Sequence, residues 1–430
     1  MKKCRAKLGT RIALVLLMPT IFTGCAKTST ENGTHAESSP ESGQTLVYCT
    51  WDDERAYTER LVEMFMAEHR DISIEVIYNS EEMTAERAAE LLKEEKIDII
   101  GLKDANDVLH LKKYEQVIDI TDWILDSGLD VSRYGNMYND ISDKGKYYCL
   151  PSRKTCWALA YNKEIFAHEG MDFPEQMTWD EFADLAEQLT TGEGEERQWG
   201  CLFGTWVCDF LGIQKKNYLY DDDLTYVQES LELLNRIYFE DCSSMTPDEI
   251  EAAGWLESFE QGNVAMMPMG EWLVGMIMEE EKHGKSSVDW DFAPMPVPEN
   301  QKAGTTWGNY QVVAVTTECA SAGRTEAAYE FLSYLCGKDG AKVYAASGML
   351  PAYMDEEIEE IYRDAIGNHN AEVFFDAYLV QESPVYRGYK DLKDILKEET
   401  YPLWKGLQSV QETMQNFENR RQQYFENKRS

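Results

Sequence analysis

The sequence predicts an α/β protein with two lobes. Three observations support this class: a strand–helix–strand–helix–strand pattern early in the folded part, a second start of such a pattern at Ala158, and the proline-rich link "APMPVPENQKAG" at residues 293–304. Alternating strands and helices are typical of a mostly parallel sheet covered by helices. Because the pattern starts twice and a link follows the second start, we expect two such units and a chain that crosses between them.

The first unit alternates strands with helices. Strands are expected at "TLVYCTW" (45–51), "ISIEVIY" (72–78) and "KIDIIGL" (96–102). The segments between them, "ERAYTERLVEMFMAEH" and "AERAAELLKEE", carry apolar residues at helical spacing. The order predicts strands that run parallel to one another.

The second unit starts with the strand "ALAYN" (158–162). A helix follows at "TWDEFADLAEQL", where Thr178 and Glu181 have the spacing of a capping box. Later strands are expected at "VAMMPM" and "YQVVAVT", and the helix "RTEAAYEFLSYLC" should end at Gly337. The last third is helical and finishes with the polar helix near "SVQETMQNFENRRQQYF".

Residues 1–24 read as an export signal. Basic side chains precede an apolar run from Ile12 to Phe22, which is shorter than the roughly 20 residues that span a bilayer. Gly24 and Cys25 resemble the lipobox of bacterial lipoproteins, in which the cysteine is acylated, although Phe22 stands where Leu is usual. The alternative is an ordinary secretory signal with an incidental cysteine. Residues 25–44 are rich in Ser, Thr, Glu and Gly and predict a disordered tether.

Charge and cysteine content limit the classes of function. The net charge of −37 repels phosphate backbones and argues against a nucleic-acid partner. Eight cysteines remain beyond Cys4 and Cys25, and none forms a CxxC pair. An exported chain can oxidise its cysteines, so disulfides and buried free thiols both stay open.

Enzyme and metal motifs are missing from the sequence. The six histidines form no HExxH-type pair, and no GxSxG elbow or Walker loop occurs. The segment "DDDLTYVQESLE" carries Tyr226 where a calcium loop needs Gly. We therefore expect a protein that is not an enzyme and that holds no metal or cofactor. A surface glycoside hydrolase with paired carboxylates is the less favoured alternative.

Four segments of the chain carry recognisable motifs, in this order: "LPSRKTCWALAYNKEIFAHEGMDFPEQMTWDEF", "SFEQGNVAMMPMGEW", "WDFAPMPVP" and "EAAYEFLSYLCGKDGAKVYAASGMLPAY". Taken in this order, they resemble the family 1 extracellular solute-binding proteins of bacterial ABC importers, which include the maltose-type sugar-binding lipoproteins. The resemblance covers nearly all of residues 45–430. It implies a periplasmic-binding-protein-like fold with a ligand cleft between two lobes joined by crossing segments. The implied lobes are 45–154 with 303–350, and 155–302 with 351–430.

The resemblance and the strand ends together select candidate ligand contacts. Residues just beyond strands face the cleft of an open α/β sheet, and others lie on the crossings. Aromatic planes suit the C–H faces of a sugar, whereas carboxylates, amides and guanidinium groups suit its hydroxyls. The candidates are Trp51, Asp52, Asp104, Arg153, Trp206, Asp209, Glu271, Trp272, Trp307, Asn309 and Tyr310. The rival role for each tryptophan is core packing, and for each charged residue a solvated loop or an ion pair between lobes.

The resemblance implies the substrate-capturing subunit of an ABC importer. We expect a monomer, anchored by lipid at the extracellular face of the bacterial cell membrane, that binds a sugar or oligosaccharide and delivers it to permease subunits. The same fold loaded with a polyamine, peptide or other polar solute is the alternative within this class. The sequence does not identify the sugar, because side-chain directions in the cleft decide it.

Overall fold

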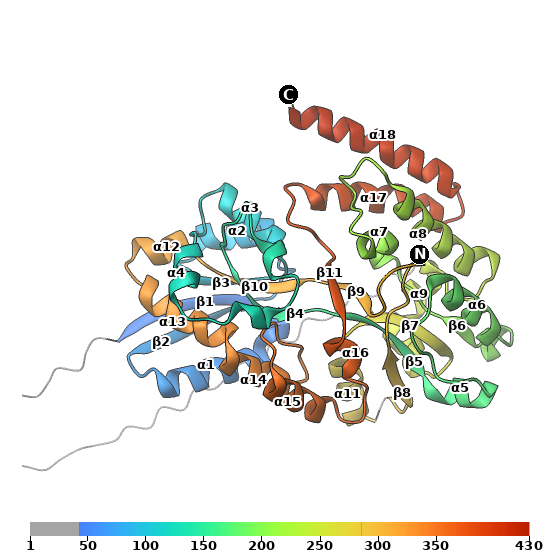
Figure 1. Ribbon diagram of the computed structural model, residues 1–430, viewed down its shortest axis with the longest axis horizontal. Helices are drawn as coiled ribbons and strands as arrows, with labels where there is room; N and C mark the ends of the chain where they lie inside the picture. Colours follow the sequence, from blue (N-terminus) through green and yellow to red (C-terminus); the bar gives the residue numbers. More distant parts are fainter. Residues whose placement is uncertain (1–42, 285, 430) are drawn as a thin grey trace, which may run out of the picture. The chain divides into compact units, whose positions relative to one another are not determined.

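The protein folds around two β-sheets joined by short crossing segments, which confirms the predicted α/β class (Figure 1). The computed structural model describes residues 43–429 with the exception of residue 285. The predicted signal peptide at 1–24, Cys25 and the tether up to residue 42 lie outside the described residues. In the described part of the chain, no helix is both long and apolar enough to span a bilayer.

The first sheet has five strands in the order β2-β1-β3-β10-β4. The strands are β1 (Gln44–Trp51), β2 (Ile72–Asn79), β3 (Ile99–Leu102), β4 (Leu150–Lys154) and β10 (Tyr310–Val315). β1 runs parallel to β2 and β3, as predicted, because each intervening helix returns the chain to the same end of the sheet. β10 enters from a distant part of the chain and runs antiparallel to β3 and β4.

The second sheet has four strands in the order β6-β7-β5-β8. The strands are β5 (Trp157–Asn162), β6 (Trp199–Cys201), β7 (Val264–Gly270) and β8 (Trp290–Ala293). β6 and β7 are parallel, whereas β5 is antiparallel to β7 and β8. Every residue of β7 is buried, which explains its continuous apolar sequence, since a central strand is covered on both faces.

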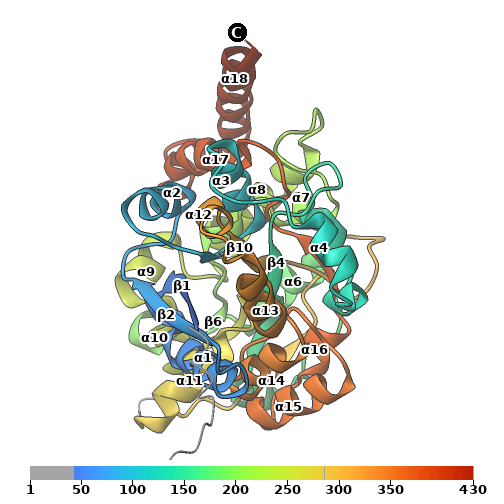
Figure 2. The same cartoon turned by 90° about the vertical axis from the view of Figure 1, so that its left-hand side faces the viewer.

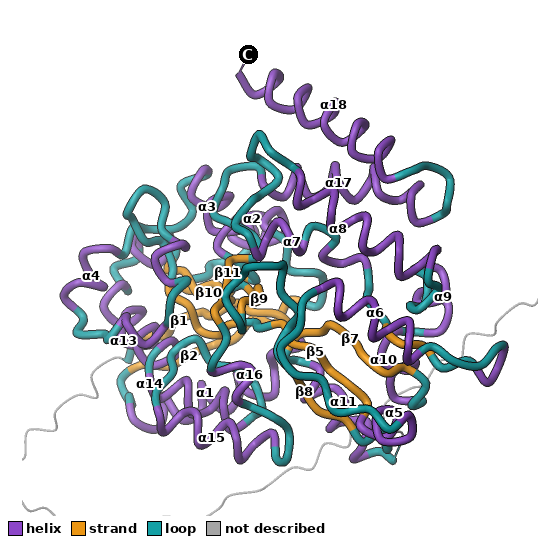
Figure 3. Tube along the Cα trace, turned by 45° about the vertical axis from the view of Figure 1, so that its right-hand side comes forward, coloured by secondary structure: helices purple, strands orange, loops and turns teal. Residues whose placement is uncertain are grey.

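A third, two-stranded sheet lies between the other two (Figure 3). Its strands, β9 (Thr305–Gly308) and β11 (Tyr378–Gln381), are parallel. The chain passes from the first main sheet to the second between β4 and β5, and it returns from β8 through β9 to β10. The two crossings contact each other, because the Thr155 backbone N–H donates to the Asn309 carbonyl at 2.8 Å.

Helices cover both faces of the first sheet. In Figure 2, α2 (Ala85–Glu94) and α3 (Ala105–Lys113) lie above this sheet, whereas α1 (Arg55–Glu68) and α14 (Lys338–Ala346) lie below it. The other α-helices are α4 (Thr121–Asp126), α5 (Lys163–Glu169), α6 (Trp179–Leu189), α7 (Phe210–Gln214), α8 (Thr225–Asn235), α9 (Pro247–Ala253), α10 (Trp255–Glu260), α11 (Leu273–Lys282), α12 (Thr317–Ser321), α13 (Thr325–Cys336), α15 (Glu356–Ile366), α16 (Glu372–Phe375), α17 (Tyr389–Trp404) and α18 (Val410–Arg429).

Two local predictions about helix ends are confirmed. Thr178 caps α6: its hydroxyl accepts from the Glu181 backbone N–H at 3.2 Å, and the Glu181 carboxylate accepts from the Thr178 backbone N–H at 2.7 Å. The helix α13 ends at Cys336, directly before Gly337. Both signals are local, so the sequence alone suffices to read them.

The buried apolar side chains form two large clusters. One gathers mainly around the first sheet and the other around α6, α7, α8 and α17, and Trp272 packs against both clusters. The eight described cysteines are free thiols; seven are buried, and Cys242 is exposed. Burial of these thiols inside apolar clusters accounts for their high number without any disulfide among them.

Candidate ligand-binding site

The strand ends of the two main sheets meet at the crossings. In the first sheet, the start of β10 lies beside the end of β4, since Tyr310 pairs with Lys154. In the second sheet, the start of β5 lies beside the end of β7, since Trp157 pairs with Gly270. The chain from Lys154 to Trp157 is short, so these two edges adjoin. We call the ends of β1, β3 and β4 the first edge, and the ends of β6 and β7 the second edge.

Four candidate residues lie at the first edge, three of them at the ends of β1 and β3. Trp51 ends β1 and is only 7% exposed, with the Lys103 ammonium 5.9 Å from its ring centre. Asp52 follows and is exposed, and its carboxylate pairs with Arg55 at 2.6 Å. Asp104 caps α3 by accepting the backbone N–H groups of Asn106 and Asp107 at 2.6 and 3.3 Å. The carboxylates of Asp52 and Asp104 are therefore engaged within their own edge.

Arg153, on β4, is the centre of a buried polar network at the first edge. It is 7% exposed, donates to the Tyr57 hydroxyl at 2.5 Å and lies 3.7 Å from the Glu54 carboxylate. With its amide oriented to satisfy both neighbours, Gln311 donates to Glu54 at 2.8 Å and accepts from Arg153 at 3.3 Å. Burial raises the pKa of Glu54, and the Arg153 charge partly opposes this shift.

Glu271 connects the second edge to the crossing. It directly follows β7, is 1% exposed, and accepts the Cys156 backbone N–H at 2.9 Å through Oε2. Its other oxygen, Oε1, is buried and has no hydrogen-bond partner among the described residues. Burial raises the pKa of Glu271 to about 7, although the Cys156 N–H and the Arg153 charge both favour the carboxylate. Oε1 of Glu271 is therefore a buried acceptor at the second edge that has no hydrogen-bond donor among the described residues.

Trp272 and Trp206 present aromatic surface at the second edge. Trp272 is half-buried and packs edge-to-face on Trp157, with ring centres 5.4 Å apart and planes at 88°. Trp206 follows β6 and keeps 46% of its surface exposed. Asp209, three residues on, is buried instead, and burial raises its pKa against the opposing charge of Lys393.

Three candidates on the crossing from β9 to β10 are committed to internal packing. Trp307 is fully buried among aromatic rings, with Trp157 at 5.5 Å and Trp179 at 6.4 Å between ring centres. Tyr310 is 1% exposed and donates to the Tyr134 carbonyl. Asn309 is half-buried, and its side-chain oxygen accepts the Ser383 backbone N–H at 3.1 Å. In this conformation neither Trp307 nor Tyr310 offers a ring face to solvent.

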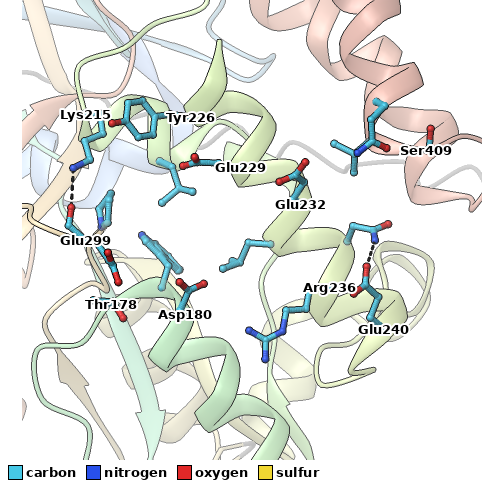
Figure 4. A pocket seen from close by; sticks show the side chains of 17 residues that line it. Thr178, Asp180, Lys215, Tyr226, Glu229, Glu232, Arg236, Glu240, Glu299 and Ser409 are labelled. Atoms are coloured by element: carbon cyan, nitrogen blue, oxygen red, sulfur yellow. Dashed lines mark hydrogen bonds between the residues drawn. The ribbon is translucent and has the colours of Figure 1, made fainter. Parts of the chain in front are cut away.

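Two hollows lie on the side of the second sheet. The larger, of about 880 Å³, is bounded by α6, α8 and the start of α18 and is lined by none of the eleven candidates (Figure 4). Acidic side chains dominate it, and its Lys215 already donates to the Glu299 carbonyl at 3.0 Å. The smaller, of about 460 Å³, opens beside Trp206 at the second edge. The smaller hollow is thus the one that adjoins the strand ends.

The sequence analysis did not select several residues that lie at these edges. Glu54, Tyr57 and Gln311 surround Arg153, and Lys103 lies over Trp51. The position of Lys103 directly after a buried strand could have revealed it, whereas the other three meet Arg153 only through tertiary packing. Within the described residues, no group of three or more His, Cys, Asp or Glu side chains is arranged to hold a metal ion.

Comparison with known proteins finds relatives both in sequence and in structure. An arabinooligosaccharide-binding protein from Halalkalibacterium halodurans is 24% identical over 314 residues, which are 65% of this chain and 67% of that protein. The crystal structure of a sugar transporter from Rhizobium etli, in an open conformation, shares 26% identity, covers 87% of this chain and 98% of its own, and superposes with a TM-score of 0.79.

A more distant structure supports the fold alone. An ABC substrate-binding protein from Listeria monocytogenes, in complex with cycloalternan, is 19% identical, covers 89% of this chain and 99% of its own, and has a TM-score of 0.75. The sequence model of bacterial extracellular solute-binding proteins matches residues 60–358, which include both crossings and every strand of the two main sheets except β1. The chain belongs to this family of bacterial extracellular solute-binding proteins.

Proposed function

We propose that this protein captures a sugar or oligosaccharide between the first and second edges and delivers it to the permease of an ABC importer. The observation that carries the proposal is the half-buried Trp272 beside the unsatisfied Glu271 oxygen, both directly beyond β7 at a crossing. A tryptophan plane next to a buried acceptor suits a ring with C–H faces and hydroxyl groups. The names of the relatives from Halalkalibacterium halodurans and Rhizobium etli favour the same ligand class.

Each edge contributes a different part of the binding chemistry. On the second edge, Trp272 and Trp206 supply stacking surface, and Glu271 accepts a hydroxyl hydrogen. The first edge supplies the ring of Trp51 and, as polar groups, the side chains of Asp52, Asp104 and the Arg153 network. Four other candidates are engaged in internal contacts that hold the crossings and the second sheet, namely Trp307, Asn309, Tyr310 and Asp209. Their side chains contribute to binding if movement of the lobes exposes them to the ligand.

Closure of the lobes over the ligand is the transport signal in this proposal. The lobes, 45–154 with 303–350 and 155–302 with 351–430, rotate about the paired crossings near Thr155 and Asn309. Ligand contacts made with both edges at once favour the closed form, because a ligand shifts an equilibrium only by its differential affinity. The permease recognises that closed form. No chemical step is needed, in keeping with a family and fold of substrate-binding proteins.

The proposed lipid anchor is based on the sequence motif at Gly24 and Cys25 alone. Acylation of Cys25 tethers a monomer at the extracellular face of the cell membrane. Replacement of Cys25 by Ser should abolish metabolic labelling with palmitate and release the protein or leave its precursor uncleaved. Normal lipid labelling of the variant would contradict the assignment.

A ligand screen tests the central claim. Thermal unfolding is measured with arabino- and maltooligosaccharides, monosaccharides, polyamines and short peptides, and each solution is then analysed for cleavage products. A bound sugar at a hundredfold excess over its Kd should stabilise the protein by about 2.7 kcal/mol and be recovered intact. Stabilisation by a polyamine or peptide alone would establish the alternative ligand class, and catalytic turnover of a sugar would establish a hydrolase.

A further inference from the structure

Two neighbouring strands end in the same Gly-x-Trp turn. β6 is followed by Gly204-Thr205-Trp206, and β7 ends in Gly270, which is followed by Glu271-Trp272. The strands are parallel, with Cys201 paired to Met266, so both turns lie at the second edge. The repetition places two tryptophans on adjacent strands, each two residues beyond a glycine.

In both turns the tryptophan ring folds back over the glycine. A Cβ atom on Gly204 would lie 2.6 Å from a ring carbon of Trp206, and one on Gly270 would lie 1.9 Å from a ring carbon of Trp272. Real Cβ atoms do not approach other atoms so closely, so any side chain there would displace the ring. Gly204 has φ of −72° and ψ of 161°, which every residue adopts readily. Glycine is therefore needed at this position for space and not for its backbone freedom.

The two rings differ in what lies next to them. Trp272 packs on Trp157 at the inner side, close to the crossing. Trp206 packs edge-to-face on Trp255, with ring centres 5.9 Å apart, and it borders the hollow of about 460 Å³. A tryptophan that keeps 46% of its surface exposed gains little from core packing, so a structural role explains its position poorly.

The hollow beside Trp206 combines aromatic and charged side chains. Trp255, Tyr401 and Trp404 line it, and Tyr401 is 63% exposed. Asp248 and Lys405, which pair with each other, supply a carboxylate and an ammonium group at its rim. Aromatic faces with a few polar groups around them are the chemistry that recognises a sugar ring. The elements involved, α9, α10 and the end of α17, all lie on the side of the second sheet.

We propose that this hollow is an outer sugar subsite, so that the protein binds an oligosaccharide extending from Trp272 past Trp206 toward Trp255 and Tyr401. The inference rests on the proposed function, because it needs the inner sugar at Trp272. It adds that affinity depends on the length of the sugar chain, and that the Gly204 turn sets this dependence by holding the Trp206 ring in place.

Titration calorimetry with two sugar series tests the subsite. The probes are the maltooligosaccharides and the α-1,5-linked arabinooligosaccharides, each from disaccharide to hexasaccharide. The wild-type affinity should rise with chain length in the series that binds. Trp206→Ala should weaken hexasaccharide binding at least about tenfold and disaccharide binding less than about twofold. Gly204→Ala should act in the same direction, because it keeps the indole and only shifts it.

Controls separate a lost subsite from a lost fold. Tyr114→Ala removes an aromatic ring that is 49% exposed on the side of the first sheet, and it should leave every affinity unchanged. The melting temperatures of Trp206→Ala and Tyr114→Ala should match the wild type, since both side chains are exposed. Gly204 is buried, so the affinities of Gly204→Ala are measured well below its own melting temperature. Equal losses for short and long sugars, or a wild-type affinity independent of length, would overturn the subsite. Absence of binding in both series would overturn this inference alone, whereas absence of stabilisation by every sugar of the ligand screen would overturn the proposed sugar function as well.

Discussion

Replacing Glu271 by Gln removes a buried charge beside the crossing while keeping the shape of the side chain. The carboxyl group is 1% exposed and accepts one hydrogen bond, from the Cys156 backbone N–H. Burial raises its pKa from 4.5 to about 7, despite the favourable Cys156 bond and Arg153 charge. Glutamine can accept the same bond through its amide oxygen and never ionises.

The size and sign of the effect follow from proton linkage. Between pH 4.5 and about 7 the folded protein keeps a proton on Glu271 that the unfolded chain has lost, so the free energy of unfolding falls as the pH rises through this window. At about 1.36 kcal/mol per pKa unit, the full loss amounts to about 3 kcal/mol. The Glu271→Gln variant lacks this loss. It should match the wild type within about 1 kcal/mol at pH 5 and exceed it by about 3 kcal/mol at pH 8.

Urea unfolding of both proteins at pH 5 and pH 8 measures the effect as a difference of differences. Glu63→Gln, at an exposed position of α1, is the matched control and should change neither stability. If Glu271→Gln alters the stability equally at both pH values, the carboxyl group does not carry the raised pKa, and the reasoning about its burial fails.

Three further predictions concern single side chains. Trp272→Ala should weaken sugar binding by an order of magnitude or more, as titration would measure. It should lower the melting temperature less than the loss of a fully buried tryptophan, which costs roughly 3–5 kcal/mol. A collapsed melting temperature with unchanged affinity would identify Trp272 as a core residue. Trp307, which is fully buried, should show that full loss on replacement by Ala, and a small loss in urea unfolding would contradict its packing. In the folded protein a thiol reagent should modify Cys242 before any of the seven other described cysteines, with peptide mapping by mass spectrometry as the readout; equal rates would contradict their burial.

The site shows where sequence reasoning reaches its limit. Strand ends are visible in the sequence, so residues such as Trp206, Trp272 and Trp307 could be selected as candidates. Whether a ring then turns to the core or to solvent depends on contacts with distant segments. Trp307 is covered by Trp157 and Trp179, whereas Trp206 stands over Gly204 with part of its surface free. The ligand-binding roles of all these residues stay predictions.

The sequence by itself determined the α/β class, the parallel start of the first sheet, the caps at Thr178 and Gly337, and the family. These properties depend on local periodicity, on hydrogen bonds between near neighbours, and on motifs in a set order. Only the tertiary structure decided that Arg153 is enclosed by Glu54, Tyr57 and Gln311, and that the Glu271 oxygen is orphaned. The reason is physical: burial and hydrogen-bond satisfaction are set by chain segments far apart in sequence, whose side-chain directions no local pattern specifies.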